Sequence, residues 1–197
     1  VILLRDPVAR AYSSFQYMRA RGFEPAEDFL EAVAQESERL AAHWHHLWHY
    51  TRMSMYADAV AAVQAAVPAD QVGIWFYEDL DRDHDATIAE VTRFLGLAPT
   101  ATDDGPAPRV NISGTPRSRL LHRGLLWVTR HEAPRSAVKA VTTYRFRERV
   151  RSLALRRGDV SEQARASLAP VFAEDVSRLR KLLPDSSVGW LADGGAP

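Results

Sequence analysis

The first residues of the chain predict a short buried strand followed by a helix. Residues 1–4 are an uninterrupted apolar run, and two polar residues separate this run from Pro7. Pro7 suits the first position of a helix because it has no N–H to leave unpaired, and Asp6 can cap the free amides. We therefore expect a strand over residues 1–4 and a helix from residue 7 to about residue 20, ending near Gly22.

Apolar residues at helical spacing continue through the following segment. Residues 26–50 predict one or two helices, because their apolar positions recur at intervals of three and four. A further amphipathic helix begins near Tyr56 and is stopped by Pro68. The apolar positions of these helices are Phe29, Leu30, Val33, Leu40, Trp44, Leu47, Trp48, Val60, Val63 and Val67.

A second strand and another helix come next. Residues 72–77 are a short β-prone run bounded by polar residues, which predicts a buried strand. Asp85 is expected to start the next helix, and Gly96 is expected to close it. Because two strands are separated by a long helical stretch, we predict an α/β fold in which helices wrap a parallel sheet. The inward-facing positions of the helix before Gly96 are expected to be Ile88, Val91 and Leu95.

The C-terminal half predicts a loop followed by helices. Residues 98–116 are rich in Thr, Asp, Gly and Pro, a composition typical of a loop. Helices are expected over about 118–130, 134–150 and 162–183, and Pro170 is expected to kink or restart the last of them. The apolar positions of that last helix are Leu168, Phe172, Val176, Leu179 and Leu183.

Composition limits the classes of protein to which the chain can belong. A chain of 197 residues with 46% hydrophobic content can bury one sizeable core, so we expect one domain over residues 1–197. Its 25 basic residues balance 25 acidic ones, so we expect neither nucleic acid nor a membrane as a partner, and any anion site must be local. The absence of Cys excludes disulfides and thiolate metal sites and fits the reducing cytosol, where we expect the protein.

The junction between the first strand and the first helix has the features of a phosphate site. The strand fixes the position of Arg5, whose planar fork can grip phosphate oxygens bidentately. The helix N-terminus adds partial positive charge. Ser13, about two turns into the helix, can supply a hydroxyl donor. The alternative is that residues 5–7 form only a well-capped turn between a strand and a helix.

This segment resembles part of a known family, the sulfotransferases that use 3′-phosphoadenosine 5′-phosphosulfate (PAPS). Their second nucleotide-binding segment is an apolar strand, then Arg-(Asp/Asn)-Pro, then a Ser eight residues after the Arg. The resemblance implies that Arg5 and Ser13 hold the 3′-phosphate of PAPS. It also implies a P-loop-like parallel sheet, and sulfuryl transfer from PAPS to a hydroxyl or amine of a small-molecule or carbohydrate acceptor, without a metal.

The middle of the chain is similar to the same family. The family's central pattern is a Tyr at the start of a helix, a strand ending in Tyr-Glu-Asp-Leu, and a helix ending in Phe-Leu-Gly, which here fall at Tyr56, 75–80 and 93–97. The resemblance implies that Tyr56 lies by the adenine; the alternative is an ordinary core aromatic. We expect Glu78 and Asp79 to orient loop amides and neighbouring basic groups, rather than to transfer protons.

Two further arginines are candidates for the nucleotide site. Residues 111–119 resemble a segment of bacterial members of the family, and related sulfotransferases close basic residues of the equivalent loop over the 3′-phosphate. The resemblance therefore points to Arg117 and Arg119. Two arginines in the first turn of a helix oppose its dipole, and an anionic partner would relieve that conflict. The alternative is a solvated face.

Some parts of the family pattern do not occur in the sequence. PAPS sulfotransferases begin with a strand and a Gly/Ser/Thr-rich loop that binds the 5′-phosphosulfate, and their general base usually follows that loop. Neither feature occurs before Val1, which is not an initiator Met. We therefore expect the C-terminal part of a longer enzyme, with unidentified catalytic residues upstream and a fragment that is itself inactive. The alternatives are a non-catalytic nucleotide-binding or scaffolding domain, and a helical interaction protein.

A histidine-rich stretch over residues 43–49 is a separate candidate. His45 and His49 are four apart, a spacing that on a helix puts two imidazoles on one face, as in zinc sites. No third ligand is evident, so we expect no metal. The alternatives are that Trp and His side chains border the acceptor pocket, or that the stretch is a partly buried structural helix, which is the reading we favour.

Overall fold

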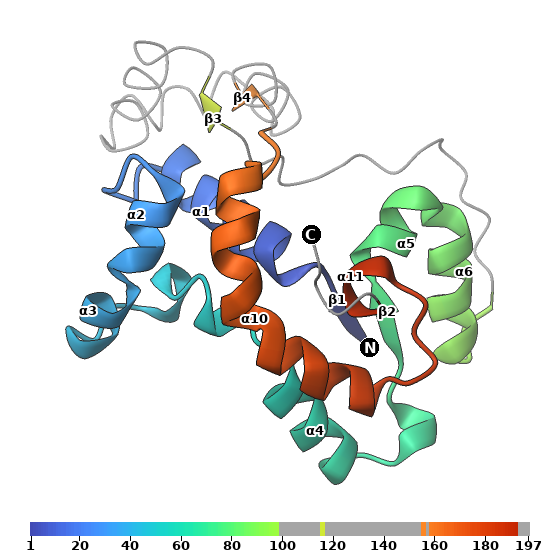
Figure 1. Ribbon diagram of the computed structural model, residues 1–197. Coiled ribbons are helices and arrows are strands. Elements are labelled where there is room, and N and C mark those ends of the chain that lie inside the picture. The colour runs from blue at the N-terminus through green and yellow to red at the C-terminus, as the bar shows by residue number, and fades with distance from the viewer. Residues whose placement is uncertain (99–114, 117–154, 157, 193–197) are drawn as a thin grey trace, which may run out of the picture. The chain divides into compact units, whose positions relative to one another are not determined.

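The computed structural model describes residues 1–98, 115–116, 155–156 and 158–192 (Figure 1). These residues belong to two compact units. The described residues of the first unit are 1–10, 51–98 and 161–192. Those of the second unit are 11–50, 115–116, 155–156 and 158–160.

The first unit contains the predicted pair of parallel strands. Strand β1 (Ile2–Leu4) pairs with β2 (Ile74–Phe76), and Leu4 lies opposite Phe76 in the last register position. Both of these side chains are buried. Strand β2 is shorter than the β-prone run because Tyr77 already begins helix α5 (Tyr77–Arg82). The carboxyl ends of the two strands therefore meet at one edge, where α/β folds bind their ligands.

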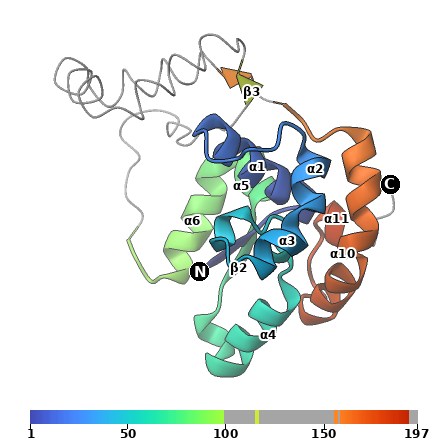
Figure 2. The ribbon, with the colours of Figure 1, turned by 90° about the vertical axis from the view of Figure 1, so that its left-hand side faces the viewer.

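Helices of the first unit pack in two groups (Figure 1, Figure 2). Helix α10 (Glu162–Leu182) packs on α4 (Ala57–Ala66) and on α11 (Gly189–Ala192). Helix α5 packs on α6 (His84–Phe94). Two 3₁₀ turns, η2 (Arg52–Ser54) and η3 (Ala69–Gln71), flank α4. As predicted, α4 ends just before Pro68, whose ring cannot continue a helix.

Helix α10 buries most of the apolar face that its sequence predicts, although Leu183 lies just beyond its end and is half-buried. Ser161 caps it by accepting a hydrogen bond from the Ala164 amide. The helix continues through Pro170 and changes direction along its length (Figure 1). Its buried apolar side chains include Leu168, Phe172, Val176 and Leu179.

Helix α6 differs from the prediction in where it starts and in what it buries. It begins at His84 because the Asp83 side chain caps it, accepting from the Ala86 amide. Thr87 is buried, whereas Ile88 is 40% and Leu95 is 52% exposed, so the predicted inward face is wrong at both of these positions. Gly96 closes the helix as predicted, in the left-handed conformation (φ 67°) that glycine adopts at no steric cost.

The second unit is helical and has an aromatic core. It contains most of α1 (Pro7–Ala20), together with α2 (Phe29–Ala34), α3 (Glu36–Ala41) and the 3₁₀ turn η1 (His46–Trp48). Phe15 packs against Phe29 and Tyr50, with ring centroids 5.4 and 5.9 Å apart. A short antiparallel pair joins β3 (Thr115–Pro116) to β4 (Leu155–Arg156).

Helix α1 ends where the sequence predicts. Gly22 has a φ of 72°, and its amide donates to the carbonyl of Arg19. The Phe23 amide reaches back to the carbonyl of Met18 at 3.0 Å. This pair of hydrogen bonds is the Schellman arrangement, which satisfies carbonyl groups at the end of the helix.

The stretch over residues 26–50 is less helical than its apolar spacing suggests. After α3 the amide of His43 donates to Leu40, and that of Trp44 donates to Arg39. His43 has a φ of 55°, so it takes the left-handed position that usually belongs to glycine. The chain therefore leaves the helix before the aromatic positions that continue the pattern, and Leu47 is 42% exposed.

Several predicted elements lie outside the described residues. These are the helices expected over 118–130 and 134–150, and the predicted loop over 98–116 apart from residue 98 and strand β3.

Candidate functional site

Asp6 caps helix α1 at the point where β1 ends. Its Oδ1 accepts a hydrogen bond from the Ala9 amide at 2.6 Å, and Pro7 is the buried first residue of the helix. The Oδ2 atom forms an ion pair with Arg165 of α10 at 3.0 Å. The predicted cap is therefore confirmed. Because Asp6 occupies the Ala9 amide, an anion bound here would depend on the Arg5 side chain more than on free helix amides.

Arg5 follows β1 directly and places a positively charged guanidinium at this strand edge. Its guanidinium carbon lies 4.5 Å from the centre of the Tyr77 ring, a cation–π contact with the first residue of α5. Among the described residues, none forms a hydrogen bond or an ion pair with this guanidinium. The side chain is half-buried. Arg5 is thus held by an aromatic ring while its hydrogen-bond donors remain available for an anion.

The carbonyl and the amide of the peptide group that joins Arg5 to Asp6 each form a hydrogen bond with a side chain. The Tyr56 hydroxyl donates to the carbonyl oxygen of Arg5 at 3.0 Å. The Asp6 amide donates to Oε1 of Glu78, also at 3.0 Å. The second contact agrees with the expectation that Glu78 orients a loop amide. The neighbouring Asp79 forms its ion pair with Arg82, on the exposed surface of α5.

Tyr56 lies among charged groups. Burial raises the pKa of its hydroxyl above the ordinary value, and the positive charge of Arg10 opposes that shift. Arg10 donates to the Ser54 hydroxyl at 3.2 Å, and burial lowers the pKa of its guanidinium. The Tyr56 hydroxyl therefore stays protonated at neutral pH, which it must do in order to donate to the Arg5 carbonyl.

Asp175 of α10 fixes the backbone of Tyr56 and was not singled out from the sequence. Its carboxylate accepts from the Tyr56 amide at 2.7 Å and from the Ala57 amide at 3.1 Å, at the start of α4. The Asp175 side chain is buried. One signal for it exists in the sequence, because Asp175 is an acidic residue next to the apolar positions Phe172 and Val176 of an amphipathic helix.

Replacing Asp175 by Asn should lower the free energy of unfolding by about 1–2 kcal/mol. The Asn side chain has only one acceptor oxygen, whereas two backbone N–H groups donate to Asp175. Urea denaturation of the wild-type and variant chains measures this difference. Asp58→Asn is the matched control: Asp58 pairs with Arg178 on the surface of the same unit, so its loss should have little effect. Equal losses of stability in the two variants would contradict the assigned capping role.

The other predicted nucleotide-binding residues, Ser13, Arg117 and Arg119, do not lie among the described residues of the first unit. Ser13 is a half-buried residue of α1 in the second unit. Arg117 and Arg119 lie outside the described residues. Arg5 and Tyr56 are the two predicted site residues that the first unit brings together, through the hydrogen bond to the Arg5 carbonyl.

The histidine-rich stretch contains the 3₁₀ turn η1 but no α-helix, so the favoured prediction of a structural helix is wrong, and so is the placement of His45 and His49 on one helix face. His45 caps η1 by accepting from the Leu47 amide, and His49 ends that turn with a buried ring. His43, His45 and His46 are exposed. In the part of the chain that the structure describes, no three His, Cys, Asp or Glu side chains are grouped to hold a metal ion.

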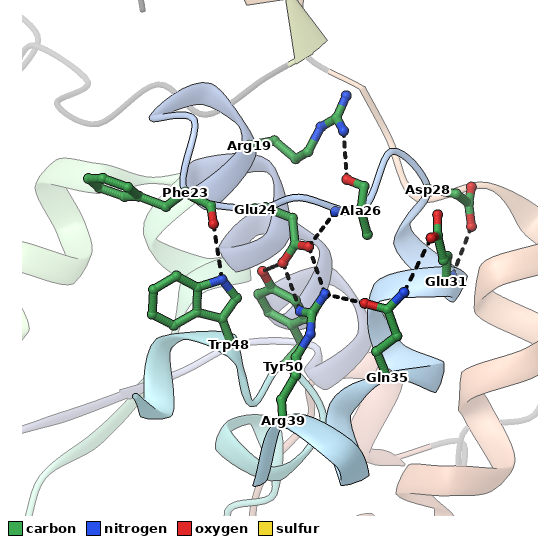
Figure 3. Close-up of polar contacts among 10 residues, drawn as sticks. All are labelled: Arg19, Phe23, Glu24, Ala26, Asp28, Glu31, Gln35, Arg39, Trp48 and Tyr50. Carbon is green, nitrogen blue, oxygen red and sulfur yellow. Dashed lines mark hydrogen bonds and ion pairs between the residues drawn. The ribbon is translucent and has the colours of Figure 1, made fainter. Parts of the chain in front are cut away.

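A buried polar network joins three segments of the second unit (Figure 3). Glu24, from the loop after α1, accepts two hydrogen bonds at 2.8 Å from Arg39 of α3. The same carboxylate accepts from the Tyr50 hydroxyl and from the Ala26 amide. Burial raises the pKa of Tyr50, and its hydrogen bond to Glu24 adds to the shift. Gln35 accepts a further hydrogen bond from Arg39, so the network ties this loop to α3.

No helix of the described residues is long and apolar enough to span a bilayer.

Comparisons with known proteins agree with the predicted fold. The crystal structure of a sulfotransferase from Alicyclobacillus acidocaldarius matches with a TM-score of 0.63 at 23% sequence identity. The match covers 96% of this chain and 56% of that one, so the chain spans little more than half the length of its structural relative. This likeness in fold confirms the predicted α/β class. No curated protein sequence matches the chain at a significant level.

The family assignment comes from a sequence model. The model of the sulfotransferase domain matches residues 1–111, which include the Arg5 segment and the pattern from Tyr56 to Gly96. The matched region is more than half of the 197 residues. The chain therefore belongs to the sulfotransferase domain family.

Proposed function

We propose that the chain supplies the adenosine and 3′-phosphate part of a PAPS site, in a sulfotransferase whose acceptor is a hydroxyl or amine of a small molecule or carbohydrate. The observation that carries the proposal is the position of Arg5 and the state of its guanidinium. This residue directly follows a parallel strand, and its guanidinium has no carboxylate partner among the described residues. A guanidinium can bind two phosphate oxygens at once, which gives both charge and direction to the contact.

The family resemblance assigns the other members of the proposed site. Ser13 would donate its hydroxyl to the 3′-phosphate, and Tyr56 would lie by the adenine. Arg117 and Arg119 would close over the phosphate. Each assignment is a proposal of its own, and each can be tested by substituting that residue alone.

The proposed reaction transfers a sulfuryl group in line. A bond forms between sulfur and the acceptor oxygen or nitrogen while the bond from sulfur to the 5′-phosphate oxygen breaks, and the acceptor loses its proton to a general base. Adenosine 3′,5′-bisphosphate is the leaving product. Positioned amides and cations can neutralise charge on the sulfuryl oxygens, so the proposal requires no metal. Arg5 would act by holding the donor at its 3′ end.

Calorimetric titration of the chain with two nucleotides tests the donor-site proposal. Adenosine 3′,5′-bisphosphate should bind at least about tenfold more tightly than adenosine 5′-monophosphate, because only the first nucleotide carries the phosphate that Arg5 would bind. Equal affinities, or no binding of either nucleotide, would contradict the proposal. Transfer of labelled sulfate from PAPS to a panel of hydroxyl and amine acceptors, by the natural protein, tests the reaction itself.

A further inference from the structure

We infer that Tyr56 and Glu78 are positioning residues for Arg5, an inference that rests on the proposed function. The carbonyl oxygen of Arg5 and the amide of Asp6 are the two polar ends of one planar peptide group. Tyr56 donates to one end and Glu78 accepts from the other, each at 3.0 Å. The two side chains thus clamp the peptide group that immediately follows the Arg5 side chain.

The clamp is assembled from parts of the chain that are far apart in sequence. Tyr56 precedes α4 and lies 51 positions from Arg5, whereas Glu78 belongs to the first turn of α5 and lies 72 positions from Asp6. Tyr56 is itself held through its amide by Asp175. Each half of the clamp is therefore anchored in a different helix-bearing segment, which restricts rotation of the peptide group about the backbone.

The chemistry of Glu78 exceeds what a purely structural contact requires. Its Oε2 atom is buried and has no hydrogen-bond partner among the described residues, while Oε1 accepts from the Asp6 amide. A buried carboxylate oxygen without a donor lowers stability, and Gln in its place would keep the amide contact without the charge. We attribute the cost to the task of holding the backbone beside two cations, Arg5 and Arg10, whose charges act on the same Tyr56 hydroxyl.

The clamp would act on binding through the order of the Arg5 side chain. Because strand β1 fixes the chain before Arg5, a fixed peptide group after it limits rotation about the Cα–C bond and so sets the direction of the Arg5 Cα–Cβ bond. Tyr77 supports the guanidinium from its ring face at 4.5 Å. A guanidinium ordered before binding loses less conformational freedom when it grips a phosphate. Removing the clamp should therefore weaken binding of the 3′-phosphate without removing any group that touches it.

A double-mutant cycle tests this mechanism in the 197-residue chain. Tyr56→Phe, which keeps the ring, should weaken adenosine 3′,5′-bisphosphate binding about 3–10-fold, and Glu78→Ala about 5–20-fold. In an Arg5→Ala background each change should cost less than about twofold, because a positioning residue acts only through the residue it positions. Glu78→Gln keeps the amide contact without the charge, so it should restore only part of the affinity lost in Glu78→Ala. The matched control is Glu90→Ala, which removes a Glu that accepts from Trp75 on the exposed surface.

Equal losses with and without Arg5 would overturn the inference. A ligand-free measurement separates this outcome from a failure of the proposed function. By NMR, Glu78→Ala should speed hydrogen exchange of the Asp6 amide, and both Tyr56→Phe and Glu78→Ala should raise the mobility of the Arg5 side-chain Nε–H. Unchanged exchange and mobility would reject the clamp. Preserved ordering by the clamp, together with no preference for a 3′-phosphate, would reject the donor site and, with it, a role of the clamp in binding.

Discussion

Replacing Arg5 by Ala should weaken binding of adenosine 3′,5′-bisphosphate by about 2–4 kcal/mol, or roughly 30–1000-fold in Kd. The reason is that a charge-assisted, bidentate contact is lost, and Ala offers neither charge nor donors in its place. Arg5→Lys should lie between wild type and Arg5→Ala, because Lys restores the charge but not the planar fork. Calorimetric titration of the three proteins measures the series.

Two comparisons make this result specific to the 3′-phosphate. Arg82→Ala removes an exposed arginine from α5 of the same unit, whose partner is Asp79, and should leave the affinity unchanged. Binding of adenosine 5′-monophosphate should also be insensitive to Arg5→Ala. If Arg5→Ala binds adenosine 3′,5′-bisphosphate as tightly as wild type does, the assignment of Arg5 to the phosphate is wrong.

Replacing Glu24 by Gln should lower the free energy of unfolding by about 3–5 kcal/mol, because it leaves the buried guanidinium of Arg39 without its counter-charge. The side chains of Arg39 and Glu24 are 3% and 0% exposed, so solvent cannot compensate for the loss. Urea denaturation followed by Trp fluorescence reports on this change, since Trp44 stacks on Arg39 and Trp48 donates to the carbonyl of Phe23.

A second substitution distinguishes an unpaired charge from a general loss of packing. Adding Arg39→Met to Glu24→Gln removes the stranded cation and should recover part of the stability. Glu31→Gln is the matched control, because Glu31 accepts from Gln35 on the exposed surface of the same unit and its replacement should change stability by less than about 0.5 kcal/mol. A Glu24→Gln midpoint equal to that of wild type would show that the network is dispensable.

Elements that are set by local chemistry could be predicted from the sequence. Asp6 and Pro7 start α1, Pro68 follows the end of α4, and Gly96 closes α6, because capping and ring constraints act within a few residues. The parallel pairing of β1 with β2 followed from two apolar runs joined by a helical segment. The position of Arg5 at the strand edge is a consequence of the same local signals.

The parts that could not be predicted depend on contacts between distant segments. Asp175 lies 119 positions from the Tyr56 amide that it binds, and no spacing in the sequence announces that pair. The end of α3 was missed for a different reason, since His43 adopts a backbone conformation for which glycine is the usual signal. The face of α6 was misjudged because burial is decided by what packs against a helix, and Thr87 is buried where Ile88 is not.

The Glu24 network also constrains how this sequence can change over generations. One carboxylate accepts from the guanidinium of Arg39, the hydroxyl of Tyr50 and the backbone amide of Ala26, so replacing Glu24 leaves all three donors poorly matched. A lineage that exchanges Glu24 must pass through a poorly folding intermediate unless Arg39 changes with it. Natural variants should therefore change these two positions together. A library that randomises one of them alone should recover almost only the parental residue among its folded members.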